Sequence, residues 1–215
     1  MQELVNVTAI VLSSGPIGEY DRRVVLLTKE RGKITSFAKG ARKQTSKLMA
    51  ATNLFAFGEF KLYPGRNSYT MTDARIHYYF EELRIDFEGA YYGMFFLEVC
   101  DYYTRENNDE KEFLKLLYQS LKALLVKSLN RKLVQCVFEI KAMVINGEFP
   151  GIPQNRKWQE STEYAISYIM ASSIEKLYTF TVSDIVLEEL IWIAENYRFR
   201  YIDREFKSLE MLSFL

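Results

Sequence analysis

Hydrophobic and polar positions alternate in short runs through the first 78 residues, and this pattern predicts β-strands. The runs are rich in Val, Ile, Thr, Phe and Tyr, and Gly, Pro, Asn or Ser bounds each of them, as is typical of strands. Residues 46–52 are expected to form a short helix, because Thr45 and Ser46 are good N-cap candidates. Turn-rich segments lie at 13–18 and 64–67. The five predicted strands span residues 5–12, 20–28, 33–39, 54–63 and 68–76.

The hydrophobic phase of the fourth predicted strand changes at Gly58. Phe55 and Phe57 alternate in one phase, whereas Phe60 and Leu62 alternate in the other. Side chains of a strand alternate with period two, so a phase change beside a glycine predicts a β-bulge or a barrel corner. We expect the three phenylalanines in the core. Five strands, a helix between the third and fourth, and this bend predict the small Greek-key barrel called the OB-fold.

From about residue 79 the hydrophobic period lengthens to that of an amphipathic α-helix. Helices are predicted over 87–99, 113–124 and 133–144, and the last should end at Asn146–Gly147, a good C-cap. More helices are expected near 158–173, 183–197 and 204–213. No low-complexity linker separates the halves, so the barrel should pack directly on the helices. We predict a two-domain, all-β plus all-α protein: an OB-fold nucleic-acid-binding domain over 1–78 and an α-helical domain over 79–215.

The charges are balanced in total but not along the chain. The sequence holds 28 Lys and Arg and 28 Asp and Glu, yet residues 1–80 carry 12 basic against 6 acidic residues. A basic front half on a neutral chain indicates an anionic partner. Cys100 and Cys136 offer neither a disulfide framework nor a metal-ligand pair, and we expect both to be buried in a reducing compartment. With no signal-peptide pattern and no long apolar run, the protein is expected to be soluble and cytoplasmic, without a membrane partner.

Motifs for catalysis are mostly absent. Gly32–Lys33 is followed by Ile34 and lacks the upstream glycine of a phosphate-binding loop. His77 is the single histidine, and no motif accompanies it or Cys100 as a base and nucleophile. A lone histidine near a strand end is more often structural or solvent-exposed. We therefore expect a protein that is not an enzyme.

Cations are dense between residues 22 and 47, where Glu30 is the one acid opposing nine Lys and Arg. The simplest alternative is a solvated face, which suits the residues around the predicted hairpin tip. The stretch from Lys39 to Lys47 fits that alternative less well, because Gly, Gln, Thr and Ser separate its cations and no acid does. That composition favours a flexible loop that grips phosphates. The nine cations are Arg22, Arg23, Lys29, Arg31, Lys33, Lys39, Arg42, Lys43 and Lys47.

Aromatic residues near these cations matter because single strands bind by base stacking as well as by charge. Phe37, Tyr69, Tyr20 and Tyr63 are the candidates, and strand phase alone leaves open which of them face solvent. Arg66 lies in the turn between the last two predicted strands. The candidate DNA-binding residues are Arg22, Arg23, Lys33, Phe37, Lys39, Arg42, Lys43, Lys47, Arg66 and Tyr69.

Several strings of residues resemble the bacterial RecO family of DNA repair and recombination mediators. They are Thr8 to Leu12, Pro16-x-Gly18-Glu19-x-Asp21-Arg22, Leu26-Leu27-Thr28-x-Glu30-x-Gly32, Ala38 to Lys43, Phe57-Gly58-Glu59, Phe138-Glu139-x-Lys141 and Asn146-Gly147. The resemblance implies an N-terminal OB domain and a C-terminal helical domain. It implies binding to single- and double-stranded DNA, annealing of complementary strands, an interaction with RecR, and help for RecA in replacing single-strand-binding protein. Arg22, Lys39, Arg42 and Lys43 match the family's basic segment.

Two departures from the family pattern stand out. Gly15 occupies a position where the family often has Arg. Many members carry a four-cysteine zinc site after the Asn-Gly helix end, whereas residues 148–158 contain neither Cys nor His. Thiolates are what a structural zinc site requires, so we expect no metal, no cofactor and no zinc-finger loop.

The resemblance also implies that the helical half binds the acidic, Phe-ended C-terminal tail of single-strand-binding protein in an apolar pocket with a basic rim. Arg131, Lys132 and Lys141 are the rim candidates, with a solvated face as their alternative. Three classes of function stay open. They are a DNA-binding mediator, a protein-interaction module without intrinsic DNA binding, and an enzyme using His77 and Cys100.

Overall fold

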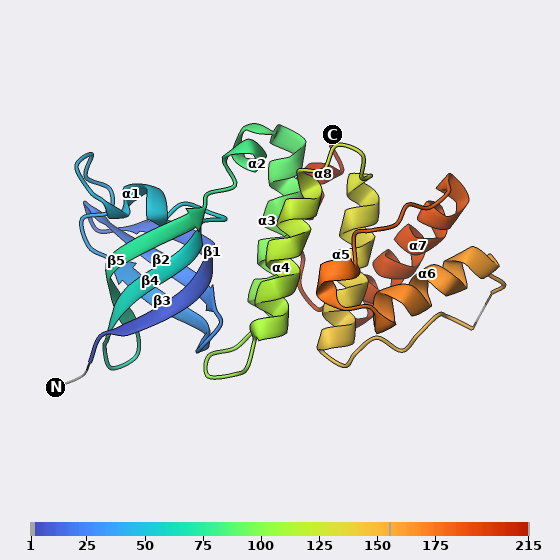
Figure 1. Cartoon of the computed structure of the whole chain (residues 1–215), viewed down its shortest axis with the longest axis horizontal. Helices are drawn as coiled ribbons and strands as arrows, with labels where there is room; N and C mark the ends of the chain where they lie inside the picture. The colour runs from blue at the N-terminus through green and yellow to red at the C-terminus, as the bar shows by residue number, and fades with distance from the viewer. Residues whose placement is uncertain (1–2, 155, 215) are drawn as a thin grey trace. The chain divides into compact units, whose positions relative to one another are not determined.

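The computed structural model describes residues 3–154 and 156–214, which form a β-barrel followed by helices (Figure 1). The predicted order of elements is confirmed, and two short helical elements, α2 and η1, were not predicted. The strands are β1 (Val5–Ile17), β2 (Asp21–Thr28), β3 (Gly32–Ala38), β4 (Phe57–Pro64) and β5 (Tyr69–Tyr78). The helices are α1 (Leu48–Ala51), α2 (Glu81–Ile85), α3 (Phe87–Tyr103), α4 (Lys111–Leu124), α5 (Arg131–Ile145), α6 (Glu160–Ala171), the 3₁₀ turn η1 (Ile174–Lys176), α7 (Asp184–Tyr201) and α8 (Lys207–Leu212).

The five strands close into a barrel in the order β1-β2-β3-β5-β4, with β4 pairing back onto β1. All neighbours are antiparallel except β3 and β5, which run parallel. The barrel interior holds an apolar cluster to which every strand contributes, with Phe60, Leu26 and Ile34 among its members. This topology, with α1 between β3 and β4, confirms the predicted OB-fold.

The predicted bend at Gly58 is confirmed, because the register between β4 and β5 shifts between Phe57 and Gly58. A Cβ at residue 58 would lie 2.2 Å from the carbonyl oxygen of Arg75, so only glycine fits there. The strand itself begins at Phe57 rather than at residue 54. Phe55 precedes it in a left-handed conformation (φ 71°) and is buried, whereas Phe57 is only half-buried.

The prediction of a loop over residues 13–18 was wrong for most of that segment, because β1 continues to Ile17. Ser14 pairs with Val24 and Ile17 pairs with Asp21. The Ser-Ser-Gly-Pro composition suggested a turn, but pairing with the whole length of β2 keeps the chain extended. This extension pairs Pro16 with Arg22. Ser14 therefore lies close to Arg22, at the end of the β2–β3 ladder where Arg22 pairs with Ala38.

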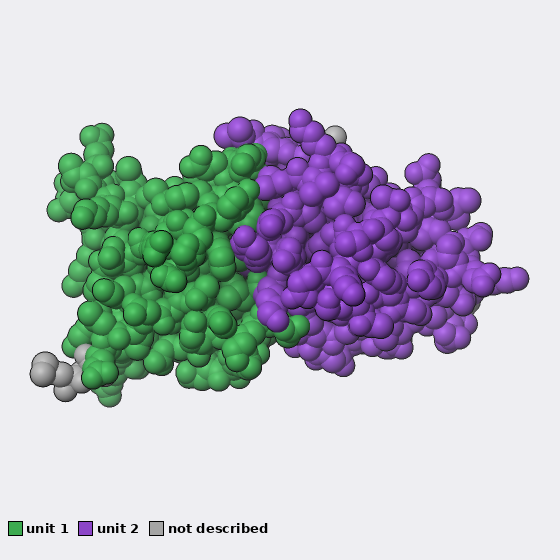
Figure 2. Space-filling model, viewed as in Figure 1, with its two compact units in different colours: residues 1–84, 97–114 green, residues 85–96, 115–215 purple. Residues whose placement is uncertain are grey.

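Two compact units make up the chain (Figure 2). The first comprises residues 1–84 with 97–114, and the second comprises 85–96 with 115–215. Unit 1 therefore combines the barrel with the end of α3, the following loop and the start of α4. The proposed domain boundary after residue 78 remains a prediction. The acid-rich segment 98–112 belongs to unit 1, which leaves that unit with 15 Lys and Arg against 14 Asp and Glu.

The β2–β3 turn is fastened to the 101–107 segment inside unit 1. The amide of Lys33 donates to the carbonyl of Arg105 (3.0 Å), and the amide of Asn107 donates to the carbonyl of Arg31 (3.0 Å). Between these bonds Gly32 adopts a φ of 65°, and a Cβ there would lie 2.2 Å from the carbonyl oxygen of Arg105. The turn and the segment thus approach so closely that no side chain fits between them.

The helices of unit 2 follow the predicted hydrophobic period. Phe96 and Phe138 stack with ring centroids 4.2 Å apart, and α5 packs on both α6 and α7. Helix α5 ends at Ile145, and Gly147 takes a positive φ of 75° as the predicted C-cap requires. Among the described residues, no helix has both the length and the apolar character needed to cross a membrane.

Candidate nucleic-acid interface

The basic loop between β3 and α1, for which the sequence predicts a flexible segment, is a series of hydrogen-bonded turns. The amide of Gly40 donates to Asp21 Oδ1 (2.7 Å), and the amide of Arg42 donates to the carbonyl of Tyr20 (2.9 Å). These bonds tie the loop to the β1–β2 turn. Its four cations, Lys39, Arg42, Lys43 and Lys47, are all exposed.

The side chains of Arg42 and Lys43 contact the β1–β2 turn through neutral groups. Arg42 Nη1 donates to the carbonyls of Glu19 (3.0 Å) and Gly18 (3.4 Å). Lys43 Nζ lies 5.1 Å from the centroid of the Tyr20 ring, a cation–π distance. Carbonyls and a ring orient these cations without neutralising them. Both side chains therefore keep a full charge available to an anion.

Arg22 is the third oriented cation of this region. It is half-buried, and its Nη1 donates to Thr52 Oγ1 (3.1 Å), to Asn53 Oδ1 (3.1 Å) and to the carbonyl of Thr52 (3.4 Å). All three acceptors are neutral. No sequence pattern identifies Asn53 or Thr52 as partners, because both lie 30 or more residues from Arg22 and carry no charge.

Arg22 and Arg42 line a common hollow, which we call the arginine hollow. It has a volume of about 290 Å³, and no carboxylate lines it among the described residues. Ser14 Oγ is shielded from solvent and has no hydrogen-bond partner in the described part of the chain. A hollow with two oriented guanidinium groups suits a phosphate group. Its lining residues are Ser14, Gly15, Pro16, Arg22, Arg42, Asn53 and Leu54.

Two further candidates are neighbours on the outer face of the barrel. Arg23 pairs across the β2–β3 ladder with Phe37. Arg23 is exposed, with Nη2 donating to Thr35 Oγ1 (3.3 Å), and the outward-facing Phe37 is half-buried. Because Arg22 pairs with Ala38 one position along, this pair lies at the same end of the ladder as the arginine hollow.

The other barrel candidates lie apart from the hollow, or their side chains already contact other groups of the protein. Lys33 lies at the opposite end of the ladder, where its Nζ forms an ion pair with Asp101 Oδ1 (3.0 Å). Tyr69 is half-buried and packs against the barrel core. Arg66 is exposed in the β4–β5 turn, and Tyr20 and Tyr63 are also exposed.

The three helical candidates have different surroundings. Arg131 forms ion pairs with Asp86 and with Glu88 (2.6 Å), which neutralise it. Lys132 is exposed. The expectation that Lys141 lies on a polar surface was wrong, because it is buried and its Nζ donates to three carbonyls at the end of α6. These carbonyls belong to Ile169 (3.1 Å), Met170 (3.0 Å) and Ser172 (2.8 Å).

Replacing Lys141 by Met should destabilise the protein by about 2 to 3 kcal/mol. The substitution keeps the apolar stem but leaves buried carbonyls without a donor and removes a cation from a helix C-terminus. Urea unfolding followed by tryptophan fluorescence measures this, since Trp158 and Trp192 both lie in unit 2. The matched control is Lys132→Met on the same helix, which should change stability by less than about 0.5 kcal/mol. Equal losses in the two variants would contradict the capping role.

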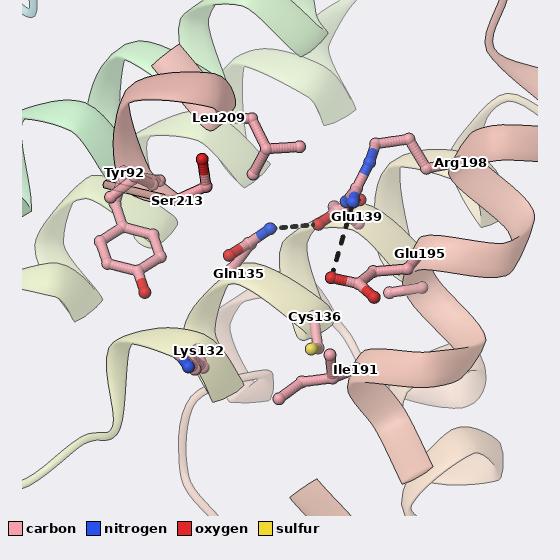
Figure 3. A pocket seen from close by; sticks show the side chains of 12 residues that line it. Tyr92, Lys132, Gln135, Cys136, Glu139, Ile191, Glu195, Arg198, Leu209 and Ser213 are labelled. Carbon is pink, nitrogen blue, oxygen red and sulfur yellow. Dashed lines mark hydrogen bonds and ion pairs between the residues drawn. The ribbon is translucent and has the colours of Figure 1, made fainter. Parts of the chain in front are cut away.

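A pocket of about 210 Å³ lies between α5, α7 and α8, with Tyr92 of α3 at its edge (Figure 3). Lys132 lines it, together with apolar side chains that include Ile191 and Leu209. Glu139 accepts from Arg198 (2.6 Å) and from Gln135 (2.7 Å) on one side of the pocket. Burial raises the pKa of the Glu139 carboxyl, and Arg198 opposes that shift. The pocket thus combines an apolar lining with Lys132 and with Arg198, which is paired with Glu139 and Glu195.

Groups suited to nucleophilic catalysis are not exposed together. Cys100 is buried, and burial raises the pKa of its thiol. His77 is half-exposed, with Nε2 3.7 Å from Glu59 Oε1. No group of three or more His, Cys, Asp or Glu side chains placed to hold a metal occurs among the described residues. The residues that replace the family's zinc loop, 148–158, do not provide ligands that fit zinc.

Comparisons with known proteins give one consistent match. A family model described as recombination protein O N terminal matches residues 1–80, and one described as recombination protein O C terminal matches residues 84–152. A protein of Acetivibrio thermocellus named DNA repair protein RecO is 26% identical over 97% of this chain and 96% of its own length. A protein of the same name from Alkaliphilus metalliredigens is 26% identical over 97% of this chain and 98% of its own length.

Proposed function

The chain belongs to the RecO family of DNA repair and recombination proteins, and from this premise we propose that it binds DNA through the arginine hollow and the adjoining basic loop. The single observation that carries this proposal is the orientation of Arg22 and Arg42 by neutral acceptors around one acid-free hollow. Lys39, Lys43 and Lys47 extend the positive surface along the loop. The bound DNA would be single- or double-stranded, since phosphates are common to both.

The proposals for more specific activities are supported by membership of the RecO family. We propose that the protein anneals complementary strands, joins RecR and helps RecA to replace single-strand-binding protein on DNA, in the cytoplasm and at the nucleoid. These are binding and exchange steps that need no catalytic residue. The buried Cys100 thiol and the pairing of His77 with Glu59 support a protein that acts without catalysis. The alternative is a protein-interaction module without intrinsic DNA binding.

The pocket of Figure 3 is our proposed site for the acidic, Phe-ended tail of single-strand-binding protein. Its apolar lining suits a phenylalanine ring, and Lys132 suits a carboxylate, whereas Arg198 is already paired with Glu139. Among the rim residues expected from the sequence, Lys132 alone lines this pocket. Lys132→Glu should therefore weaken binding of a synthetic tail peptide in a fluorescence anisotropy titration, whereas Arg131→Glu would also disturb two ion pairs and is a poorer test.

Single-strand binding should weaken steeply with salt. If about four to six phosphates are neutralised, a plot of log K against log salt should have a slope of roughly −3 to −4, at about −0.7 for each contact. Titrating a fluorescent oligonucleotide at several salt concentrations measures this slope, and exchanging its sequence should change the affinity little. A slope near zero would favour the interaction-module alternative.

A further inference from the structure

A second concave surface lies in unit 2, between the end of α4, the α4–α5 connection and the segment after η1. Its volume is about 430 Å³, which is larger than that of the arginine hollow. The proposed function leaves this surface unassigned. We call it the lysine groove. It is lined by Gln119, Lys122, Ala123, Val126, Ser128, Leu129, Glu175, Tyr178, Thr179, Phe180 and Thr181.

Four lysines lie in or beside this groove. Lys115 and Lys122 share one face of α4 with Gln119, since positions i, i+4 and i+7 of a helix align. Lys127 lies between two lining residues of the α4–α5 connection, and Lys176 ends η1. Unit 2 as a whole has 13 Lys and Arg against 14 Asp and Glu. The positive charge here is therefore a local concentration within a balanced unit.

Two acids lie near these lysines: Glu112, one turn before Lys115 on α4, and Glu175, which lines the groove. A hydrogen bond from the backbone of Glu175, another from Ser173 and the charge of Lys115 lower the pKa of the Glu175 carboxyl. The carboxylate is thus ionised and engaged locally. Two acids against four lysines leave the groove and its edge with a net positive charge, so an anionic ligand complements it.

The remaining lining favours a nucleic acid over an acidic peptide. Ser128, Thr181 and Gln119 offer hydroxyl and amide groups of the kind that contact phosphates and sugars, and the half-buried rings of Tyr178 and Phe180 lie beside them. Recognition of peptide carboxylates commonly uses the planar fork of arginine, and none of the lining residues is arginine. Lysines with aromatic rings suit contact that is independent of sequence.

We propose that the lysine groove is a second contact for single-stranded nucleic acid, separate from the arginine hollow. The inference rests on the proposed function, because annealing brings two strands together and two contacts on one protein would hold one strand each. Each strand would bind through its phosphates, one at the barrel and one at the groove. Loss of the groove should then impair annealing more than it impairs binding of one short strand.

The test uses the full chain with Lys122 and Lys127 both replaced by glutamate. A fluorescent oligothymidylate of about eight nucleotides, near the site size of one OB-fold, is titrated at low salt to saturation. The parent should bind a second equivalent that the Lys122→Glu/Lys127→Glu variant lacks, and annealing by the variant should be about tenfold slower or more. The matched control is Lys157→Glu/Lys207→Glu, which makes the same charge change at exposed positions of the same unit and should behave as the parent does.

Each other outcome counts against the proposal. A parent that binds one equivalent, or a groove variant that melts normally and keeps the second equivalent, overturns the second contact while leaving binding at the barrel intact. Binding of an acidic peptide that is abolished in the groove variant, with oligonucleotide stoichiometry unchanged, assigns the groove to a protein partner instead. A parent that binds no oligonucleotide refutes the proposed function itself.

Discussion

Reversing Arg42 and Lys43 together to glutamate should lower the affinity for single-stranded DNA by about tenfold to a thousandfold at moderate salt, and impair annealing accordingly. Each reversal removes a phosphate contact and adds repulsion toward a polyanion. The fold should lose little, since both side chains are exposed and surface substitutions usually cost within about 0.5 kcal/mol each. Oligonucleotide binding measured by fluorescence anisotropy gives the affinity, and thermal melting checks the fold.

Two comparisons make this result interpretable. The Lys157→Glu/Lys207→Glu control changes the net charge equally but lies outside the basic loop, so it should lose much less affinity. The neutral variant Arg42→Gln/Lys43→Gln should lose less than the reversal, because it removes contacts without adding repulsion. A reversal variant that melts as the parent does and still binds single strands equally well would show that these cations form only a solvated face.

Gly32→Ala is expected to destabilise unit 1 by about 3 kcal/mol or more. The backbone there is left-handed, which costs an alanine about 1 to 2 kcal/mol. The new Cβ would also lie 2.2 Å from the carbonyl oxygen of Arg105 and 3.0 Å from that of Asn108, so a backbone segment has to move. Both tryptophans lie in unit 2, so hydrogen exchange of the β2 and β3 amides is the better probe of this loss.

Gly18→Ala separates the two causes. Gly18 is also left-handed (φ 57°), but a Cβ there would meet no atom within 4 Å. It should therefore cost only the backbone term, about 1 to 2 kcal/mol. If the two variants lose equal stability, the close approach between the β2–β3 turn and residues 105–108 contributes nothing. DNA binding at low temperature, where both variants stay folded, should be unchanged for Gly32→Ala.

Local patterns predicted most of the elements and one special position. The alternation of hydrophobic residues gave the five strands, and the phase change at Gly58 marked the bulge, because both signals are carried by neighbouring residues. The extension of β1 to Ile17 had no such signal. Its residues have a turn composition, and the cross-strand partners in β2 decide their conformation.

The sequence predicted which segment of the chain holds the site, but not how its side chains are oriented. The density of cations identified the β3–α1 loop, but the orientation of Arg22 depends on Thr52 and Asn53. Lys33 is engaged by Asp101, which lies 68 residues away in the sequence, so its local sequence does not reveal this partner. Lys141 was misplaced for the same reason, since its acceptors belong to another helix. Long-range pairing of charged groups has no periodic signature in a sequence.

The fastening of the β2–β3 turn also has a consequence for synthesis on the ribosome. The amide of Asn107 bonds to the carbonyl of Arg31, so the turn lacks its partner until some 76 further residues have been made, about 4 to 15 seconds at 5–20 residues per second. By then Ile10, Leu12, Val25 and Leu27 have been synthesised, and these residues are buried in the finished protein but lie outside the barrel's apolar cluster. We expect the nascent barrel to expose apolar side chains of the kind that chaperones bind until the loop after α3 has been made.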